Sequence, residues 1–180
     1  MQRFFLLRFV LPVLILFSAA CNDILFEQPQ PSWIHENTNT FPEFVRGYYY
    51  NGYDTIEVKE KRITQYNSDK KEDDLVLSDS LIFRVDGKNY FLNFRVEGKW
   101  VVFLVKDVAD SISTFELKSD DDQTRKKLAA ITEVRKTKSA SDDSPEYIIN
   151  PSAEEFRKIL DTHIFQKTDT YRKIPPGKIK

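Results

Sequence analysis

The stretch SLIFRVDGKNYFLNFRVEGKWVVFLV, residues 80–105, decides the fold. Three runs rich in β-branched and aromatic residues are separated there by Asp86-Gly87 and Glu97-Gly98. Glycine between two such runs is a hairpin signal, because it accepts the positive φ that a two-residue turn requires. A fourth run of the same kind, residues 111–118, follows closely. Four strands joined by short turns predict an antiparallel meander.

Side-chain alternation within the meander indicates which faces are buried. The middle run places Tyr90, Leu92 and Phe94 on one face and Asn93 on the other, which is typical of a half-exposed strand. Residues 100–105 are apolar on both faces, so we expect that strand to be central or covered on its outer side. A sheet that curls on itself and carries a helix over one side satisfies both expectations.

Turn and capping signals outside the meander predict further strands and two short α-helices. Residues 46–58 are rich in tyrosine and contain Asn51-Gly52, which favours a turn between two strands. Ser152 to Glu155 has the sequence of a capping box, which marks the start of a helix. We therefore predict one mostly β domain over residues 44–180. Its other expected elements are strands at 63–66, 133–138 and 146–150, an edge strand at 169–174, helices at 121–131 and 152–161, and a charged loop at 67–74.

The start of the chain carries the signature of a bacterial secretory signal. Two arginines lie within its first eight residues, an apolar run covers residues 9–17, and the small residues 18–20 lead into Cys21. This order of basic, apolar and small residues marks a segment that is removed on export. We predict that residues 1–20 are a signal peptide, cleaved between Ala20 and Cys21.

Cys21 is the only cysteine of the chain, and it stands where a lipoprotein signal places the residue that receives lipid. A lone cysteine in an exported protein has no disulfide partner, and lipidation explains its presence. Two alternatives stay open. Ser18 and Ala20 suit ordinary cleavage without lipid, and the apolar run, which Arg8 limits on its N-terminal side, is a short candidate for a permanent span. Lipidation predicts a stable membrane anchor, with a flexible tether over residues 21–43.

The residue after the cysteine bears on where the protein resides. By resemblance to the sorting of Gram-negative lipoproteins, Asn22 lacks the aspartate that favours retention in the inner membrane. We therefore expect a lipid-anchored protein of the cell envelope, in the outer membrane of a Gram-negative bacterium.

Composition and motifs exclude several classes of function. The chain has 27 basic and 28 acidic residues, which gives a formal net charge of −1. This charge gives no reason to expect that the protein binds nucleic acid. It contains no nucleophile elbow, phosphate loop, dinucleotide fingerprint or zinc signature. His35 and His163 lack the neighbouring ligands of a metal site. We predict a protein that is not an enzyme and has neither a cofactor nor a metal.

Clusters of charged residues allow two interpretations each. The acidic groups at 72–74, 120–122 and 142–143 lack the spacing of a calcium loop and are interpreted as solvated loops and a helix cap. A basic group between residues 125 and 138 is either a solvated helix face or a contact for anionic lipid beside the anchor. Its members are Arg125, Lys126, Lys127, Arg135, Lys136 and Lys138.

Several of these segments together resemble a known architecture. Gly47-x-Tyr49 on the first strand, DTIEV at 54–58, and the meander with YFLNFR and WVVFLV are similar to the lipocalin-like barrels of small bacterial envelope lipoproteins. The likeness extends over about residues 44–174, with NPSAEEFRKIL and FQKTDTYRKI near its end. It implies a mostly β fold in which an antiparallel meander curls into a barrel and binds an apolar ligand, and it carries no catalytic residue.

The predicted function is that of a non-enzymatic binding module. A barrel of about eight strands either is filled by its own side chains or holds one small ligand. A filled barrel suits a structural or assembly lipoprotein. A barrel with a cavity suits a module that binds a small apolar ligand. An envelope protein is the other partner that a binding module of this kind could have. The residues expected to line a ligand pocket are Tyr90, Leu92, Phe94, Trp100 and Val102.

Overall fold

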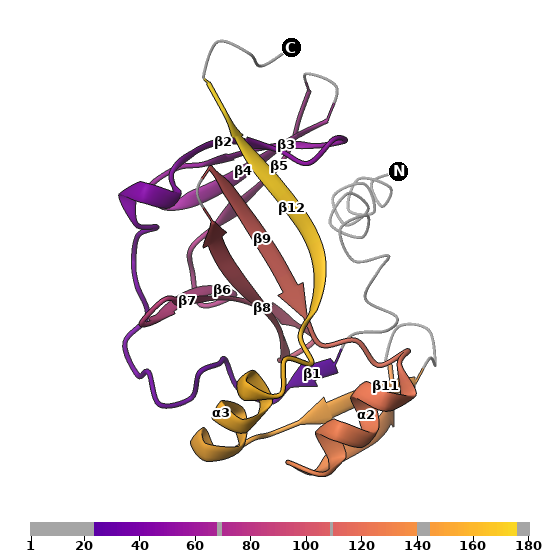
Figure 1. Cartoon of the computed structure of the whole chain (residues 1–180). Coiled ribbons are helices and arrows are strands. Elements are labelled where there is room, and N and C mark those ends of the chain that lie inside the picture. Colours follow the sequence, from indigo (N-terminus) through magenta and orange to yellow (C-terminus); the bar gives the residue numbers. More distant parts are fainter. Residues whose placement is uncertain (1–23, 68–69, 109, 140–144, 176–180) are drawn as a thin grey trace, which may run out of the picture.

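The computed structural model describes residues 24–67, 70–108, 110–139 and 145–175. There the chain forms one large mixed sheet, with helices α2 and α3 gathered at one end of the molecule (Figure 1). The strands are β1 (Ile24–Phe26), β2 (Gly47–Tyr50), β3 (Thr55–Val58), β4 (Arg62–Asn67), β5 (Lys70–Val76), β6 (Leu81–Asp86), β7 (Asn89–Val96), β8 (Lys99–Val108), β9 (Ser111–Glu116), β10 (Val134–Lys138), β11 (Pro145–Ile149) and β12 (Gln166–Ile174). The helices are the short 3-10 turn η2 (Glu43–Val45), α2 (Asp122–Ala129) and α3 (Ala153–Asp161).

The predicted meander is confirmed. Strands β6, β7, β8 and β9 pair in sequence order, each antiparallel to the next. Val96 pairs with Lys99, so Glu97 and Gly98 alone form the second turn, with φ angles of 49° and 82°. Two successive positive φ values belong to the turn whose twist matches that of the flanking strands, and glycine adopts such a value without a steric penalty.

The meander continues into a curled sheet that remains open. After β9 the strand order is β12, β2, β3, β4 and β5, and every pairing in this run is antiparallel. Among the described residues, β5 pairs only with β4 and β6 only with β7. The lipocalin-like closed barrel is therefore not confirmed. A non-strand segment covers the free edge of β6 instead, because Thr38 donates its backbone N–H to the Phe83 carbonyl at 3.1 Å.

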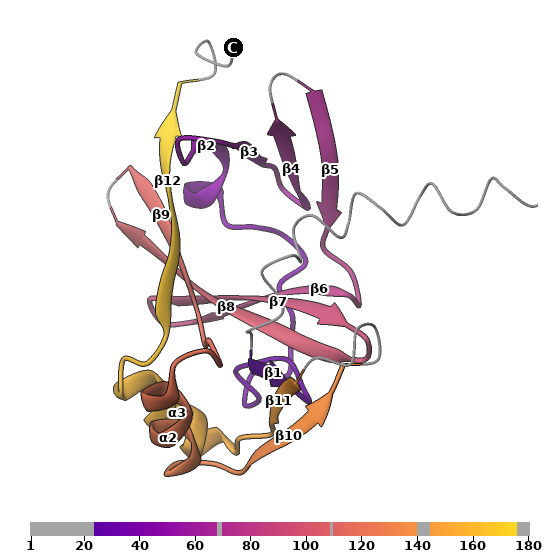
Figure 2. The same ribbon diagram turned by 90° about the vertical axis from the view of Figure 1, so that its right-hand side faces the viewer.

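Three further strands extend the sheet at the end where the helices lie (Figure 2). Strand β1 meets β8 at Phe26 and Trp100, and it runs parallel to β11, whose other neighbour is β10. Strand β12 was predicted as an edge strand, and that prediction is wrong. It lies between β9 and β2 and joins the meander to the second half of the sheet.

The segment 24–43 is part of the domain, so the predicted flexible tether is wrong over these residues. Phe26 in β1 is only 1% exposed. Farther along, the guanidinium of Arg84 donates hydrogen bonds to the carbonyls of Pro29 and Pro31, at 2.6 and 2.9 Å. Buried apolar side chains and satisfied backbone groups fix a segment that has little regular secondary structure.

The two predicted helices are confirmed, and their caps follow the sequence signals. The Asp121 carboxylate accepts two backbone N–H bonds at the start of α2. Ser152 and Glu155 form the reciprocal capping box at the start of α3. Helix α3 buries Phe156 completely. In the described part of the chain, neither helix has the length and apolar character that a bilayer crossing demands.

The apolar side chains form two main cores on opposite faces of the meander. The helix-side core lies between the sheet and helices α2 and α3, and the inner core lies within the curl of the sheet. The helix-side core includes Phe26, Phe91, Trp100, Val102, Leu128, Ile149 and Phe156. The inner core includes Phe41, Tyr49, Val58, Leu81, Phe83, Leu92 and Ile112.

Two local predictions are corrected by this arrangement. Strand β7 is not half-exposed, because Asn93 is 0% exposed and the backbone of Gln30 covers it. Residues 67–74 are not all loop, because β5 pairs with β4 from residue 70 onward. A charged strand at the edge of a sheet is common, since its charges discourage pairing with another chain.

Candidate functional site

The five predicted pocket residues do not lie on one face of the sheet. Val102 pairs with Asn93, whereas the neighbouring Leu92 pairs with Phe103. Directly paired residues share a face, so even-numbered residues of β7 and even-numbered residues of β8 point in opposite directions. Tyr90, Leu92 and Phe94 on β7 face the inner core. Trp100 and Val102 on β8 face the helix-side core.

Both groups are packed among other side chains. Trp100 is 7% exposed and Val102 is 1% exposed. On the inner side, the Tyr90 ring stacks on Phe83 with centroids 6.1 Å apart, and Phe94 meets Phe103 edge to face at 5.6 Å. These residues thus act as core, and they do not line a common ligand cavity.

The predicted lipidation residue Cys21 and the predicted cleavage residue Ala20 lie outside the described residues. The described chain begins at Ile24, whose backbone N–H donates to the Leu117 carbonyl at 3.1 Å. Three residue steps span at most about 11 Å when fully extended. A lipid on Cys21 would therefore lie close to the end of the domain that contains β1, β11 and β10.

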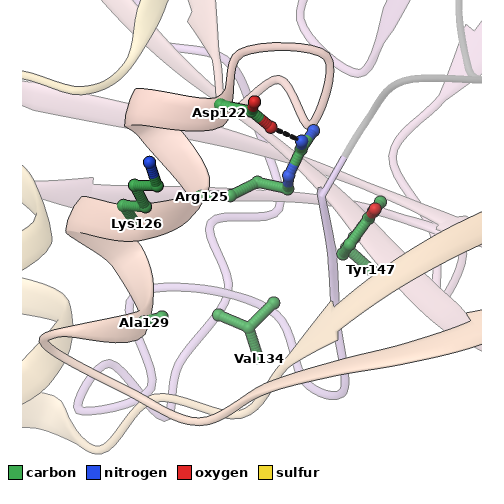
Figure 3. A pocket seen from close by; sticks show the side chains of 6 residues that line it. All are labelled: Asp122, Arg125, Lys126, Ala129, Val134 and Tyr147. Atoms are coloured by element: carbon green, nitrogen blue, oxygen red, sulfur yellow. Dashed lines mark hydrogen bonds and ion pairs between the residues drawn. The ribbon is translucent and has the colours of Figure 1, made fainter.

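At that end, an open hollow of about 330 Å³ lies between α2 and the strands β10 and β11 (Figure 3). Ala129 and Val134 contribute apolar side chains to it, and Asp122, Arg125 and Lys126 of α2 contribute charged ones. Tyr147 on β11 forms the opposite wall. The residues that line it are Asp122, Arg125, Lys126, Ala129, Val134 and Tyr147.

Two cationic groups lie near the Tyr147 ring, one from Arg125 in the lining of the hollow and one from Lys136 on β10, beside it. The Arg125 guanidinium lies 5.3 Å from the centroid of the Tyr147 ring, and the Lys136 ammonium lies 5.8 Å from it. Arg125 also forms an ion pair with Asp122, toward which it extends from α2 (Figure 3). Cations over an aromatic face are held by the negative potential of the ring. The hollow thus places charged side chains of both signs, with one more cation than anions, beside an amphipathic tyrosine.

A second polar cluster lies at the other end of the sheet. Glu57 on β3 is only 8% exposed, and its carboxylate accepts a hydrogen bond from the Tyr66 hydroxyl at 2.8 Å. The Lys59 ammonium lies 2.9 Å from the same carboxylate oxygen. Burial raises the pKa of Glu57, but hydrogen bonds from Tyr48, Lys59 and Tyr66 outweigh it and hold the pKa below its ordinary value. Glu57 is thus a charged group whose partners are already in place, and this suits a structural role better than that of a general base.

The histidines and acidic groups form no metal site among the described residues. His163 is exposed directly after α3 and adopts a φ of 52°, and His35 is exposed in the segment before β2. The three aspartates at 120–122 begin α2, where Asp121 is its cap. This agrees with the interpretation of that acidic group as a helix cap.

Sequence patterns alone do not identify the hollow, although Arg125 and Lys126 belong to the basic group between residues 125 and 138. Tyr147 lies more than 20 residues from Arg125 in the chain, and only the pairing of β10 with β11 brings Tyr147 and Lys136 together. A lysine and a tyrosine in two predicted strands would indicate this contact only if the pairing of the two strands were known, and the sequence does not predict that pairing. No family model, no curated protein and no solved structure matches this chain.

Proposed function

We propose that this is a lipid-anchored protein of the cell envelope that acts without catalysis, by binding at its surface. The observation that carries the proposal is the short distance along the chain between the predicted lipid on Cys21 and Ile24, the first residue of strand β1. Three residues leave no long tether, so the domain would rest against the membrane that holds its anchor.

The packing of the sheet supports surface binding over an enclosed apolar ligand. Leu92 and Trp100 belong to different cores on opposite faces of the meander, and both are at most 9% exposed. A structural or assembly lipoprotein with a filled core therefore fits the fold better than a carrier of a small apolar molecule.

The proposal also includes a location in the outer membrane and the absence of catalytic activity. Asn22 after Cys21 favours the outer membrane of a Gram-negative bacterium. Glu57, the carboxylate with a lowered pKa in the polar cluster, is enclosed by hydrogen-bond partners rather than placed in a cleft. The enclosure of Glu57 supports a role in binding rather than in catalysis.

Native mass spectrometry of the full-length protein, extracted in mild detergent from its own envelope, tests the proposal. We expect the protein to retain a membrane lipid or an envelope protein and to hold no stoichiometric apolar ligand once detergent is removed. A bare monomer without any partner would contradict surface binding. An apolar molecule retained in a one-to-one complex would favour the alternative, a ligand carrier.

A further inference from the structure

We propose that the hollow between α2, β10 and β11 binds the phosphate of anionic lipid headgroups in the membrane that holds the anchor. This inference rests on the proposed lipid anchor and names the surface that faces the bilayer. It assigns a specific role to Lys126, Lys136 and Tyr147.

The position of the hollow follows from the strand register. Ile24 in β1 pairs with Tyr147 in β11, and Tyr147 pairs with Lys136 in β10. Neighbouring strands are about 4.8 Å apart, so Lys136 lies roughly 10 Å from the residue at which the described chain begins. A lipid on Cys21 lies at most about 11 Å from Ile24. The anchor and the hollow therefore share one end of the domain.

The charge of the hollow is available to an outside anion. Lys126 lines the hollow, and Lys136 lies beside it on β10, paired with Tyr147. Both lysines are exposed, and neither forms an ion pair within the part of the chain that the structure describes. The two acidic groups at the start of α2 already have partners. Asp122 is paired with Arg125, and Asp121 caps the helix.

Two more carboxylates approach this surface. Glu146 lies next to Tyr147 but on the opposite face of β11, where Lys99 binds it at 3.2 Å. Glu133 is exposed just before β10, and its negative charge lowers the local positive potential. Lys126 beside the Asp122–Arg125 ion pair leaves the described lining with a net positive charge, and Lys136 adds a second ammonium group at its border.

The chemistry of the lining suits a headgroup at the membrane surface. Lysine ammonium groups attract phosphate as flexible point charges. Tyrosine is favoured at the interface between lipid and water because its ring is apolar and its hydroxyl is polar. Val134 and Ala129 add apolar surface at the same site. Each basic residue near an anionic membrane strengthens the contact about fivefold.

Amide hydrogen exchange on the acylated full-length protein in nanodiscs tests the inference. One set of nanodiscs contains phosphatidylcholine alone, and the other contains an equal mixture with phosphatidylglycerol. We expect slower exchange in α2 and β10 in the anionic nanodiscs, and the difference should disappear at high salt. Strand β10 is a sensitive reporter because it is a terminal strand of the sheet.

The double variant Lys126→Gln/Lys136→Gln should weaken the headgroup contact by about 25-fold and remove the added protection. The control Lys61→Gln/Lys88→Gln changes the net charge equally at two exposed sites outside the hollow and should keep that protection. Equal exchange of the wild type in both kinds of nanodisc would overturn the headgroup site while leaving the anchor in place. So would unchanged protection in the double variant. A protein that carries no acyl chain and leaves the nanodiscs would overturn the proposed function as well.

Discussion

Replacing Phe156 with alanine should lower the free energy of unfolding by about 3–5 kcal/mol, as expected for a fully buried aromatic residue. Phe156 is 0% exposed, and its ring lies 5.9 Å from Phe26 and 5.7 Å from Phe91, between centroids. It therefore joins α3 to β1 and β7 at once. Urea denaturation of the wild type and the variant measures the difference.

Tyr53→Ala is the matched control for that substitution. Tyr53 is 88% exposed on the turn between β2 and β3, so its removal should change stability by less than about 0.5 kcal/mol. Equal effects of the two substitutions would show that α3 does not pack on the sheet as described. The expected loss of stability at Phe156 is larger than the free energy of transferring its side chain from water to the core, because the substitution also leaves a cavity.

Asn93→Ala should cost about 2–4 kcal/mol, because it leaves two buried backbone groups without partners. The Asn93 amide oxygen accepts from the Gln30 N–H at 2.7 Å, and its amide nitrogen donates to the Gln30 carbonyl at 2.9 Å. Asn93 and Gln30 are both 0% exposed, so water cannot replace these bonds without opening the structure.

The same variant should also loosen residues 27–41, which limited proteolysis detects. Asn39→Ala makes the same chemical change at an exposed position of this segment, and we expect it to leave both stability and proteolysis unchanged. Rapid cleavage of the wild type within residues 27–41 would contradict the fixed packing of this segment on β7.

Local sequence signals were sufficient to predict the elements that are determined by interactions between residues close together in the chain. Glycines at the turns and capping residues at the helix starts fixed the meander, α2 and α3, since each acts through its own backbone. Strand β1 has no such signal. Its three residues are too few for a periodic pattern, and they are stabilised by partners more than 70 residues away in β8 and β11. A sequence pattern alone therefore favoured a tether.

The turn at Glu97-Gly98 already implies that the predicted pocket residues lie on two opposite faces of the sheet. A two-residue turn at Glu97-Gly98 pairs Val96 with Lys99, which places an odd residue opposite every even one. Leu92 and Val102 consequently point in opposite directions. The hollow is different, because the contact of Arg125 with Tyr147 depends on how α2 packs beside β11. No spacing within the sequence contains that information.

Metabolic labelling of cells with an alkyne fatty acid tests most directly whether this is a lipid-anchored protein. The wild-type protein should carry the label in the membrane fraction, and Cys21→Ala should carry none. Asn22→Ala is the neighbouring control, and it should keep the label because it preserves the thiol. If the wild type is never labelled, or if Cys21→Ala remains labelled, Cys21 is not the acylated residue and the proposed anchor is wrong.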